Sequence, residues 1–329
     1  MSDRVSCWLR WARTEVCRTA SYLGGVSAIS SVGHVRIGIS GWRYAGWRGV
    51  FYPPKLAQRR ELEFAAGKFP SVEINGTFYS LQKPEFFREW ARVTPEDFVF
   101  AVKGSRYITH MLKLRGVEQA LANFFASGLL ELGSKMGPML WQFAPQMRFE
   151  RDRFAEFFAQ LPRTHGAAAR LARHHDARLD GRAATSAARG AADLPIRHAV
   201  EIRDESFAVP KFVELLREYD IGLVVADTVA WPLLVDVTSG FVYCRLHGSE
   251  ELYVSAYGDE ALDVWADRIA AWAMGEQAEG WRACDVCAEG QPRDVYVYFD
   301  NDAKVHAPFD AERLQKKVVE RLSGCAGEW

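Results

Sequence analysis

Polar side chains that follow short apolar segments are the first residues in this sequence that could do chemistry. In residues 69–79 an apolar stretch leads to Glu73 and Asn75. Residues two apart on a strand point to the same face, so these two side chains are expected to share one face. A buried carboxylate or amide requires a hydrogen-bonding partner or a ligand. The pattern therefore indicates a polar site at the end of a buried strand.

Similar residues follow other apolar segments, and their types suggest two roles. Carboxylates and imidazoles are common acid–base groups in enzymes, and they supply the predicted catalytic residues Glu73, Glu201, Asp227 and His247. Lysine and arginine neutralise anions, and aromatic rings stack on sugars or bases. The predicted substrate-binding residues are Trp42, Tyr44, Asn75, Tyr79, Lys103, His110, Gln142, Arg203, Arg245, Tyr253, Asp300 and Asn301. For His247 and His110 a structural, hydrogen-bonded role is the alternative.

A second interpretation of the whole set stays open. Acids and bases are balanced in it, so the residues could form a salt-bridge network instead of a ligand site. Transfer of an unpaired ion into a dry interior costs several kcal/mol, so either a ligand or mutual pairing must compensate. Pocket-forming polar groups usually gather in clefts, and this favours the ligand site.

The apolar segments alternate with helical patterns and predict the fold. The expected strands cover residues 35–40, 71–75, 98–103, 138–143, 197–202, 221–226, 241–246 and 294–299. The expected helices cover residues 58–66, 117–132, 151–160, 211–219, 259–274 and 310–322, with another opened by Pro84. Eight strand–crossover units predict a single-domain α/β protein of the (β/α)8 barrel type, in which functional residues lie at the carboxyl ends of the strands. A doubly wound sheet is the alternative.

Two segments depart from this alternation. Residues 1–33 combine arginines with Trp8 and Trp11, and we predict a poorly ordered N-terminal extension, with a targeting or membrane-surface helix as the alternative. Residues 163–193 are rich in Ala, Arg and His, and we predict a partly helical, solvated insertion whose basic residues could instead meet phosphates.

Composition narrows the class of protein. The formal net charge is -1 over 329 residues, so no global basic excess indicates general nucleic-acid binding. Six scattered cysteines are typical of reduced thiols in the cytoplasm, where we expect the protein. Cys284 and Cys287 form a lone C-x-x-C pair whose role stays open. No apolar run is long enough to span a bilayer, and no membrane association is expected.

Several ordered motifs resemble the YecE-like family, also called domain of unknown function 72. They are ISGW at 39–42, FYP at 51–53, VEINGTFY at 72–79, ITH at 108–110, QFAP at 142–145, EIR at 201–203, RLHG at 245–248 and YFDND at 298–302. The resemblance implies a TIM-barrel domain over residues 34–325 and adds Thr77 to the substrate-binding residues. It implies no settled activity.

We expect this protein to be an enzyme, and a hydrolase before other classes. It would act on a phosphate-bearing or sugar-like ligand at the barrel mouth, by hydrolysis of a phosphodiester or glycoside or by isomerisation. The alternative is a non-catalytic protein that binds nucleic acid or a small ligand through residues 42–47 and 163–189. We predict no cofactor and no metal ligands. A bound divalent metal is an open alternative, because barrel strands leave no spacing signature for one, and the oligomeric state is open.

Overall fold

The computed structural model describes residues 32–248, 252–285 and 290–324. Ser31–Trp329 forms one compact unit. The prediction for the N-terminal extension lies almost wholly outside the described residues, as does Cys287.

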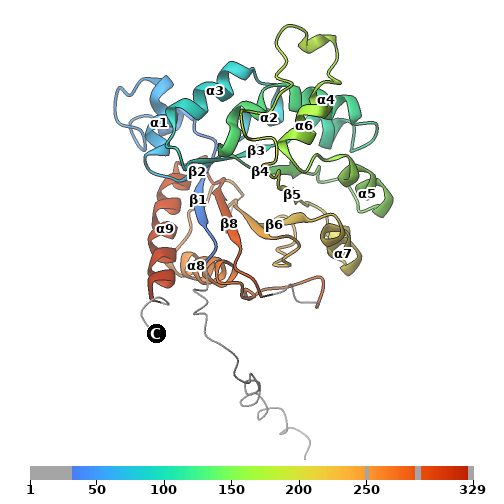
Figure 1. The fold of residues 1–329 in the computed structure, drawn as a ribbon. Coiled ribbons are helices and arrows are strands. Elements are labelled where there is room, and N and C mark those ends of the chain that lie inside the picture. The colour runs from blue at the N-terminus through green and yellow to red at the C-terminus, as the bar shows by residue number, and fades with distance from the viewer. Residues whose placement is uncertain (1–31, 249–251, 286–289, 325–329) are drawn as a thin grey trace, which may run out of the picture. The chain divides into compact units, whose positions relative to one another are not determined.

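Eight parallel strands pair in chain order and close into a barrel, because the last strand pairs with the first (Figure 1). This confirms the predicted (β/α)8 fold. The strands are β1 Val35–Ser40, β2 Ser71–Ile74, β3 Val99–Lys103, β4 Met136–Gln142, β5 His198–Glu201, β6 Ile221–Asp227, β7 Phe241–Leu246 and β8 Asp294–Phe299.

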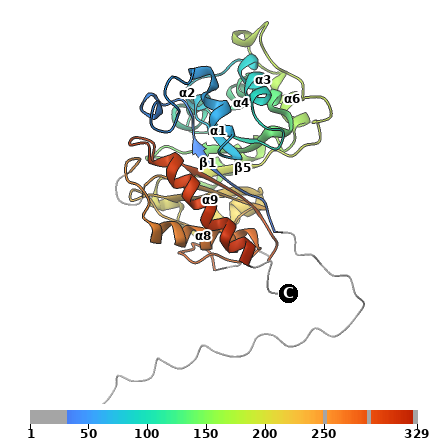
Figure 2. The same ribbon diagram turned by 90° about the vertical axis from the view of Figure 1, so that its left-hand side faces the viewer.

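Helices connect the strands on the outside of the barrel. They are α1 Glu61–Ala66, α2 Gly76–Tyr79, α3 Pro84–Val93, α4 Glu118–Ala126, α5 Arg151–Gln160, α6 His165–Ala172, α7 Pro210–Glu218, α8 Asp259–Ala273 and α9 His306–Gly324. The helices α8 and α9 lie side by side against β8 and β1 (Figure 2). The helix expected over residues 117–132 ends early, because Gly128 takes φ 118°, and a 3-10 segment Leu129–Lys135 follows.

The barrel interior is filled by alternate residues of the strands. Small and aromatic side chains form its lower layers, including Ala101, Leu140, Ala199, Tyr243 and Tyr298. A larger apolar cluster fills the space between the strands and the helices. Each strand therefore has one face in the barrel and one face on the helices, and the same period of two carries on into the polar residues at the strand ends.

The insertion at residues 163–193 is partly helical, but the expectation that it is solvated was wrong for its helix. On α6, His165, Ala168 and Ala172 are buried, and the helix packs against α4. Alanine side chains are small, so the two helices can approach closely. A short 3-10 turn, Ala177–Leu179, follows.

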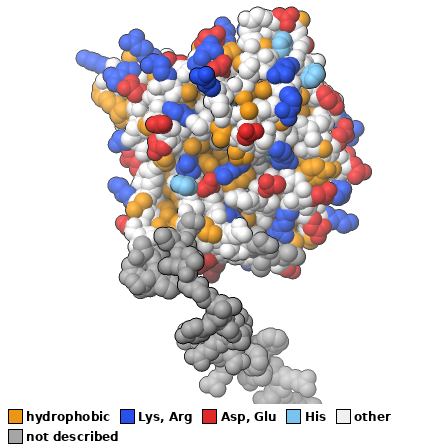
Figure 3. Space-filling view, in the orientation of Figure 1, with side chains coloured by type: hydrophobic (Ala, Val, Ile, Leu, Met, Phe, Trp, Pro, Cys, Tyr) orange, Lys and Arg blue, Asp and Glu red, His pale blue; other side chains and the backbone are white. Residues whose placement is uncertain are grey.

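The surface carries both signs of charge. Figure 3 shows Lys and Arg side chains interspersed with Asp and Glu on the face in view. Among the described residues, no helix has the length and apolar character needed to cross a lipid bilayer.

Candidate functional site

Arg245, near the end of β7, lies at the centre of the polar layer. Its guanidinium donates to Glu73 Oε1 at 2.9 Å, to Glu201 Oε2 at 2.7 Å and to Asp300 Oδ2 at 2.8 Å. It also donates to the Ser40 hydroxyl at 3.1 Å. Arg245, Glu73 and Glu201 have fully buried side chains. One planar cation therefore joins carboxylates from three separate strand ends.

Two further side chains complete this ion network. The Tyr243 hydroxyl donates to Glu73 Oε2 at 2.6 Å. His247 Nε2 lies 3.4 Å from Arg245 Nη1, which can only donate, so Nε2 acts as the acceptor. His247 Nδ1 lies 3.1 Å from Asp300 Oδ2. The imidazole is fully buried within the network.

The charges in the network hold one another in their ionised forms. Burial alone would raise the pKa of Glu201, but the guanidinium groups of Arg245 and Arg203 hold it well below its ordinary value. Burial likewise opposes ionisation of Asp300, yet Arg245 and His247 hold its pKa below the ordinary value. Both carboxylates are therefore ionised at neutral pH, and neither is a proton donor in this state.

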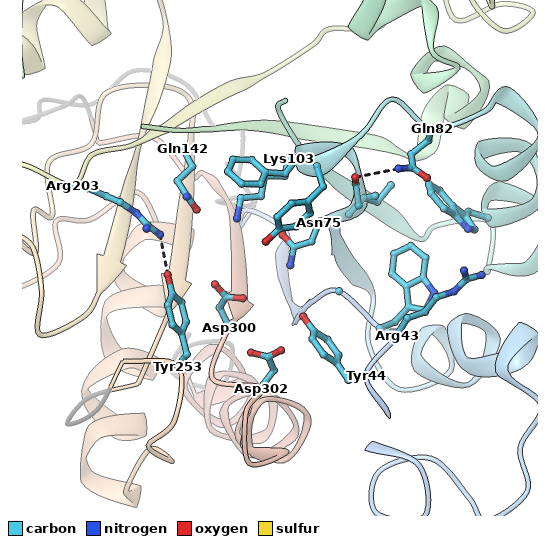
Figure 4. A pocket seen from close by; sticks show the side chains of 17 residues that line it. Arg43, Tyr44, Asn75, Gln82, Lys103, Gln142, Arg203, Tyr253, Asp300 and Asp302 are labelled. Atoms are coloured by element: carbon cyan, nitrogen blue, oxygen red, sulfur yellow. Dashed lines mark hydrogen bonds between the residues drawn. The ribbon is translucent and has the colours of Figure 1, made fainter. Parts of the chain in front are cut away.

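A cavity of about 610 Å³ adjoins the network, since Asp300 and Gln142 line it and also contact Arg245. Figure 4 shows the side chains that line this cavity. Its volume suits a small organic molecule, since ligand pockets usually measure about 300–1,000 Å³. The lining residues come from several strand ends and their loops: Gly41, Trp42, Arg43, Tyr44, Ile74, Asn75, Gly76, Phe78, Tyr79, Gln82, Trp90, Lys103, Gln142, Arg203, Tyr253, Asp300 and Asp302.

Lys103, the last residue of β3, is the lysine of this cavity. Its side chain is only 8% exposed, and its Nζ lies 4.7 Å from the centre of the Phe78 ring. Within the described part of the chain, Nζ makes neither a hydrogen bond nor an ion pair. Burial first, and then the Arg245 cation, lower the pKa of Lys103 to about 8. A substantial neutral fraction is therefore available just above neutral pH.

Asp302 lies two residues beyond Asp300, and its pKa is shifted in the opposite direction. Burial and the negative charge of Asp300 raise the pKa of Asp302 to about 6. The neighbouring Tyr44 hydroxyl donates to the Ser40 carbonyl at 2.5 Å. A pair of nearby carboxyls with pKa values driven apart is typical of acid–base sites.

Arg203 forms one wall of the cavity. Its Nε donates to Glu201 Oε1 at 2.9 Å, and its Nη2 donates to the Tyr253 hydroxyl at 3.1 Å (Figure 4). Its guanidinium carbon lies 4.2 Å from the centre of the Trp231 ring. These contacts hold the guanidinium and the Tyr253 phenol at the cavity surface, where both could meet a ligand.

The structure divides the predicted site residues into three groups. Those that line the cavity are Trp42, Tyr44, Asn75, Tyr79, Lys103, Gln142, Arg203, Tyr253 and Asp300. Those buried beneath it in the ion network are Glu73, Glu201, Arg245 and His247. Those outside both are Asp227, Asn301, Thr77 and His110. The salt-bridge interpretation therefore describes the buried group, and the ligand-site interpretation can apply only to the cavity.

Asp227 and Asn301 need correction, because their strands direct them outward. The neighbours Ala226 and Tyr298 face the barrel interior, so residues at odd distance from them point to the helices. Asp227 Oδ2 accepts from Trp265 Nε1 of α8 at 2.8 Å. Asn301 Nδ2 donates to Asp310 Oδ2 of α9 at 2.9 Å. Both side chains attach strand ends to helices.

Thr77 and His110 also lie away from the cavity lining. The Thr77 hydroxyl donates to the Lys103 carbonyl at 2.6 Å, so it fixes the end of β3. His110 lies in the π-helical turn Tyr107–Met111, where Nδ1 is 2.9 Å from the Thr109 hydroxyl. Neither residue contacts the space in which a ligand would lie.

The loop at residues 42–47 is less available for stacking than the binding-protein alternative required. Trp47 is 1% exposed, and its ring lies 4.6 Å from that of Tyr44. Trp42 packs edge-on against Trp90 at 5.2 Å. These rings mainly fill the wall of the cavity and the core behind it.

Three residues that line the cavity, Asp302, Arg43 and Gln82, are not among the site residues predicted from the sequence. Asp302 could have been found from the spacing of two that links Tyr296 and Tyr298 of β8 to Asp300 and Asp302 beyond its end. Arg43 and Gln82 lie on loops, and no periodicity locates loop side chains.

A divalent metal does not fit the residues that the structure describes. Among them, no group of three or more His, Cys, Asp or Glu side chains is arranged to hold one. At least one oxygen of each of Glu73, Glu201 and Asp300 already accepts a hydrogen bond from Arg245. A cation at their centre would meet the guanidinium charge.

Curated proteins that are similar to this chain include two UPF0759 proteins. The chain is 31% identical over 126 residues to the UPF0759 protein YunF of Bacillus subtilis, covering 37% of this chain and 44% of that protein. It is 29% identical over 132 residues to the UPF0759 protein YecE of Escherichia coli, covering 40% of this chain and 39% of that protein. The matched region spans less than half the length of each relative.

Solved structures and a family model extend the match. A DUF72 family protein of Thermotoga maritima superposes with a TM-score of 0.66 at 24% identity, covering 87% of this chain and 99% of that one. One from Enterococcus faecalis gives a TM-score of 0.61 at 18% identity, with coverages of 87% and 95%. A family model described as "Protein of unknown function DUF72" matches residues 36–327. The chain therefore belongs to the DUF72 family, and its fold is that of the solved members.

Proposed function

We propose that this protein is an enzyme that performs proton transfer on a small, sugar-like molecule carrying an anionic group. The observation that supports this most is the contrast between two cavity carboxyls that follow β8, Asp300 and Asp302. Asp300 is held ionised by Arg245, whereas the pKa of Asp302 is raised to about 6. Asp302 can therefore exchange a proton near neutral pH while Asp300 keeps a constant charge.

The lining of the cavity supports the ligand class. The rings of Tyr79 and Tyr253 line the cavity, and the Asn75 and Gln142 amides offer hydrogen bonds. Arg43 is exposed at the cavity and has no ion pair within the described residues. Aromatic faces with amides suit a sugar, and an unpaired guanidinium suits a phosphate or carboxylate.

The proposal makes a prediction about pH. Asp302 titrates near 6 and Lys103 near 8. Turnover that requires one of them protonated and the other deprotonated gives a bell-shaped profile of kcat/KM, with limbs near these two values. The same profile arises whichever of the two is the acid.

The test combines a panel of ligands with a matched pair of variants. Sugar phosphates, glycosides and phosphodiesters are incubated with the full chain in D₂O and followed by ¹H NMR, which reports hydrolysis, isomerisation and deuterium exchange together. Asp302→Asn keeps the shape of the protonated acid, so we expect it to bind an active compound but to lose turnover by about 100-fold or more. Asp193→Asn, at an exposed position, serves as the control.

Two results would contradict the proposal. One is wild-type turnover in Asp302→Asn with a substrate that the panel identifies. The other is ligand binding, seen as a change in tryptophan fluorescence, without conversion of any compound in the panel. The latter result would favour the non-catalytic small-ligand binding protein.

A further inference from the structure

Lys103 is the cavity residue that the proton-transfer proposal explains least. Its side chain is more than nine-tenths buried, yet its amine makes no hydrogen bond or ion pair in the described part of the chain. Figure 4 shows the amine directed into the hollow that Asp300 and Asp302 also face. A lysine that only balanced charge would be expected to pair with a carboxylate, as Arg245 does with Glu73.

The surroundings of Lys103 keep its amine available. One side of Nζ faces the Phe78 ring at 4.7 Å. The neighbouring carboxylates of Glu73 and Glu201 are already occupied by Arg245. Thr77 holds the backbone carbonyl of Lys103 at 2.6 Å, so the base of the side chain is fixed, while its amine has no hydrogen bond or ion pair with the described residues.

We propose that Lys103 is a nucleophile whose Nζ forms an imine with the carbonyl group of a substrate bound in the cavity. This inference rests on the proposed function and specifies it, because it requires an aldehyde or ketone, such as the open-chain form of a sugar phosphate. Lysine amines in apolar surroundings commonly play this part, since only the neutral amine attacks a carbonyl carbon.

The step balances with the groups at hand. The lone pair of neutral Nζ forms a bond to the carbonyl carbon, and the π electrons move to the oxygen. A proton passes from nitrogen to that oxygen, with Asp302 as carrier, and gives a carbinolamine. Asp302 then protonates the hydroxyl, the C–O bond breaks, and water leaves as the nitrogen forms a C=N bond. The iminium returns its proton to the Asp302 carboxylate, so an amine and a carbonyl have become an imine and water.

Reductive trapping of the full chain tests the inference. Glyceraldehyde 3-phosphate is the probe, and sodium cyanoborohydride supplies hydride that reduces any imine to a stable secondary amine. Intact mass and peptide mapping then locate the modification. Lys103→Arg keeps the charge but cannot form an imine under these conditions, and Lys211→Arg removes an exposed lysine as the matched control.

We expect one modification, on Lys103 of the wild type and of Lys211→Arg, whose rate has a bell-shaped dependence on pH with limbs near the pKa values of Asp302, about 6, and Lys103, about 8. The modification should disappear in Lys103→Arg. Modification confined to exposed lysines, or equal in all three proteins, would overturn the inference. The peptide map of the wild type gives this answer even if Lys103→Arg does not fold.

A second measurement separates this inference from the proposed function. Glycerol 3-phosphate has no carbonyl, and its binding is followed by tryptophan fluorescence. Binding of this compound together with trapping supports both ideas. Binding without trapping overturns the imine and leaves the proton-transfer proposal intact, whereas absence of both overturns both.

Discussion

The charged groups of this barrel mouth fall into two regions that differ in their partners. In the ion network, Glu73, Glu201 and Arg245 are fully buried and pair with one another. In the cavity above it, Lys103 has no hydrogen bond or ion pair among the described residues, and Asp302 has a raised pKa. Both regions contain the same residue types at the ends of neighbouring strands.

The difference teaches that residue type does not decide the role of a charge. A charged side chain that is fully paired with opposite charges cannot exchange a proton at neutral pH. It still keeps the strand ends together and contributes to the electric field in the cavity. Burial is the largest cause of the raised pKa of Asp302, and the negative charge of Asp300 is the next. The buried ion network therefore helps to set the pKa of a cavity residue that could take part in catalysis.

Removal of Arg245 should have the largest effect on stability, because it disrupts the ion network. Arg245→Met leaves Glu73, Glu201 and Asp300 without their shared cation. Loss of one partner from a buried ion pair typically costs about 3–5 kcal/mol, so we expect the free energy of unfolding to fall by at least that amount. Urea unfolding monitored by circular dichroism measures it.

Arg43→Met is the control on the open side. Arg43 is exposed and unpaired within the described residues, so its loss should change the free energy of unfolding by less than about 0.5 kcal/mol. Equal costs for the two substitutions would show that the two regions do not differ in the proposed way.

A fall in pH should have the next largest effect on stability, because it acts on the ion network. After the opposing effect of burial, Arg245 and Arg203 hold the pKa of Glu201 well below its ordinary value. A depressed acid pKa stabilises the fold above the unfolded value of about 4.3 and loses this contribution as pH falls below it. We expect the free energy of unfolding to drop by on the order of 2 kcal/mol between pH 6 and pH 3, measured by urea unfolding. Glu201→Gln should show a shallower pH dependence, and a slope identical to the wild type would contradict this.

Lys103→Met should produce the smallest and opposite effect. Burial and Arg245 lower the pKa of Lys103 to about 8, against about 10.4 in an unfolded chain. The folded protein is therefore penalised for the ammonium below pH 8, and the penalty fades as pH rises through 10.4. Methionine has a similar shape, so we expect a gain of on the order of 1–2 kcal/mol at pH 7.

The pH dependence of that gain separates the two regions. Thermal and urea unfolding of both proteins should converge above pH 10. Destabilisation by Lys103→Met at pH 7 would place Lys103 with the saturated network instead of the open cavity.

The barrel could be predicted because its signal is local and repeated. Apolar strands such as residues 221–226 and 241–246 alternate with amphipathic helices, and their period is visible without any contact map. The helix break at Gly128 and the burial of α6 were missed, because each depends on how α4 packs with its neighbours.

The sequence alone determined which residues reach the barrel mouth and, through the period of two, which of them face inward. That alternation could have excluded Asp227 and included Asp302. Only the tertiary structure decided which charges are saturated, since Arg245 meets Glu73 172 residues away in the chain. Pairing depends on distances across a closed barrel and on the local loss of water, and neither quantity is written in the order of the residues.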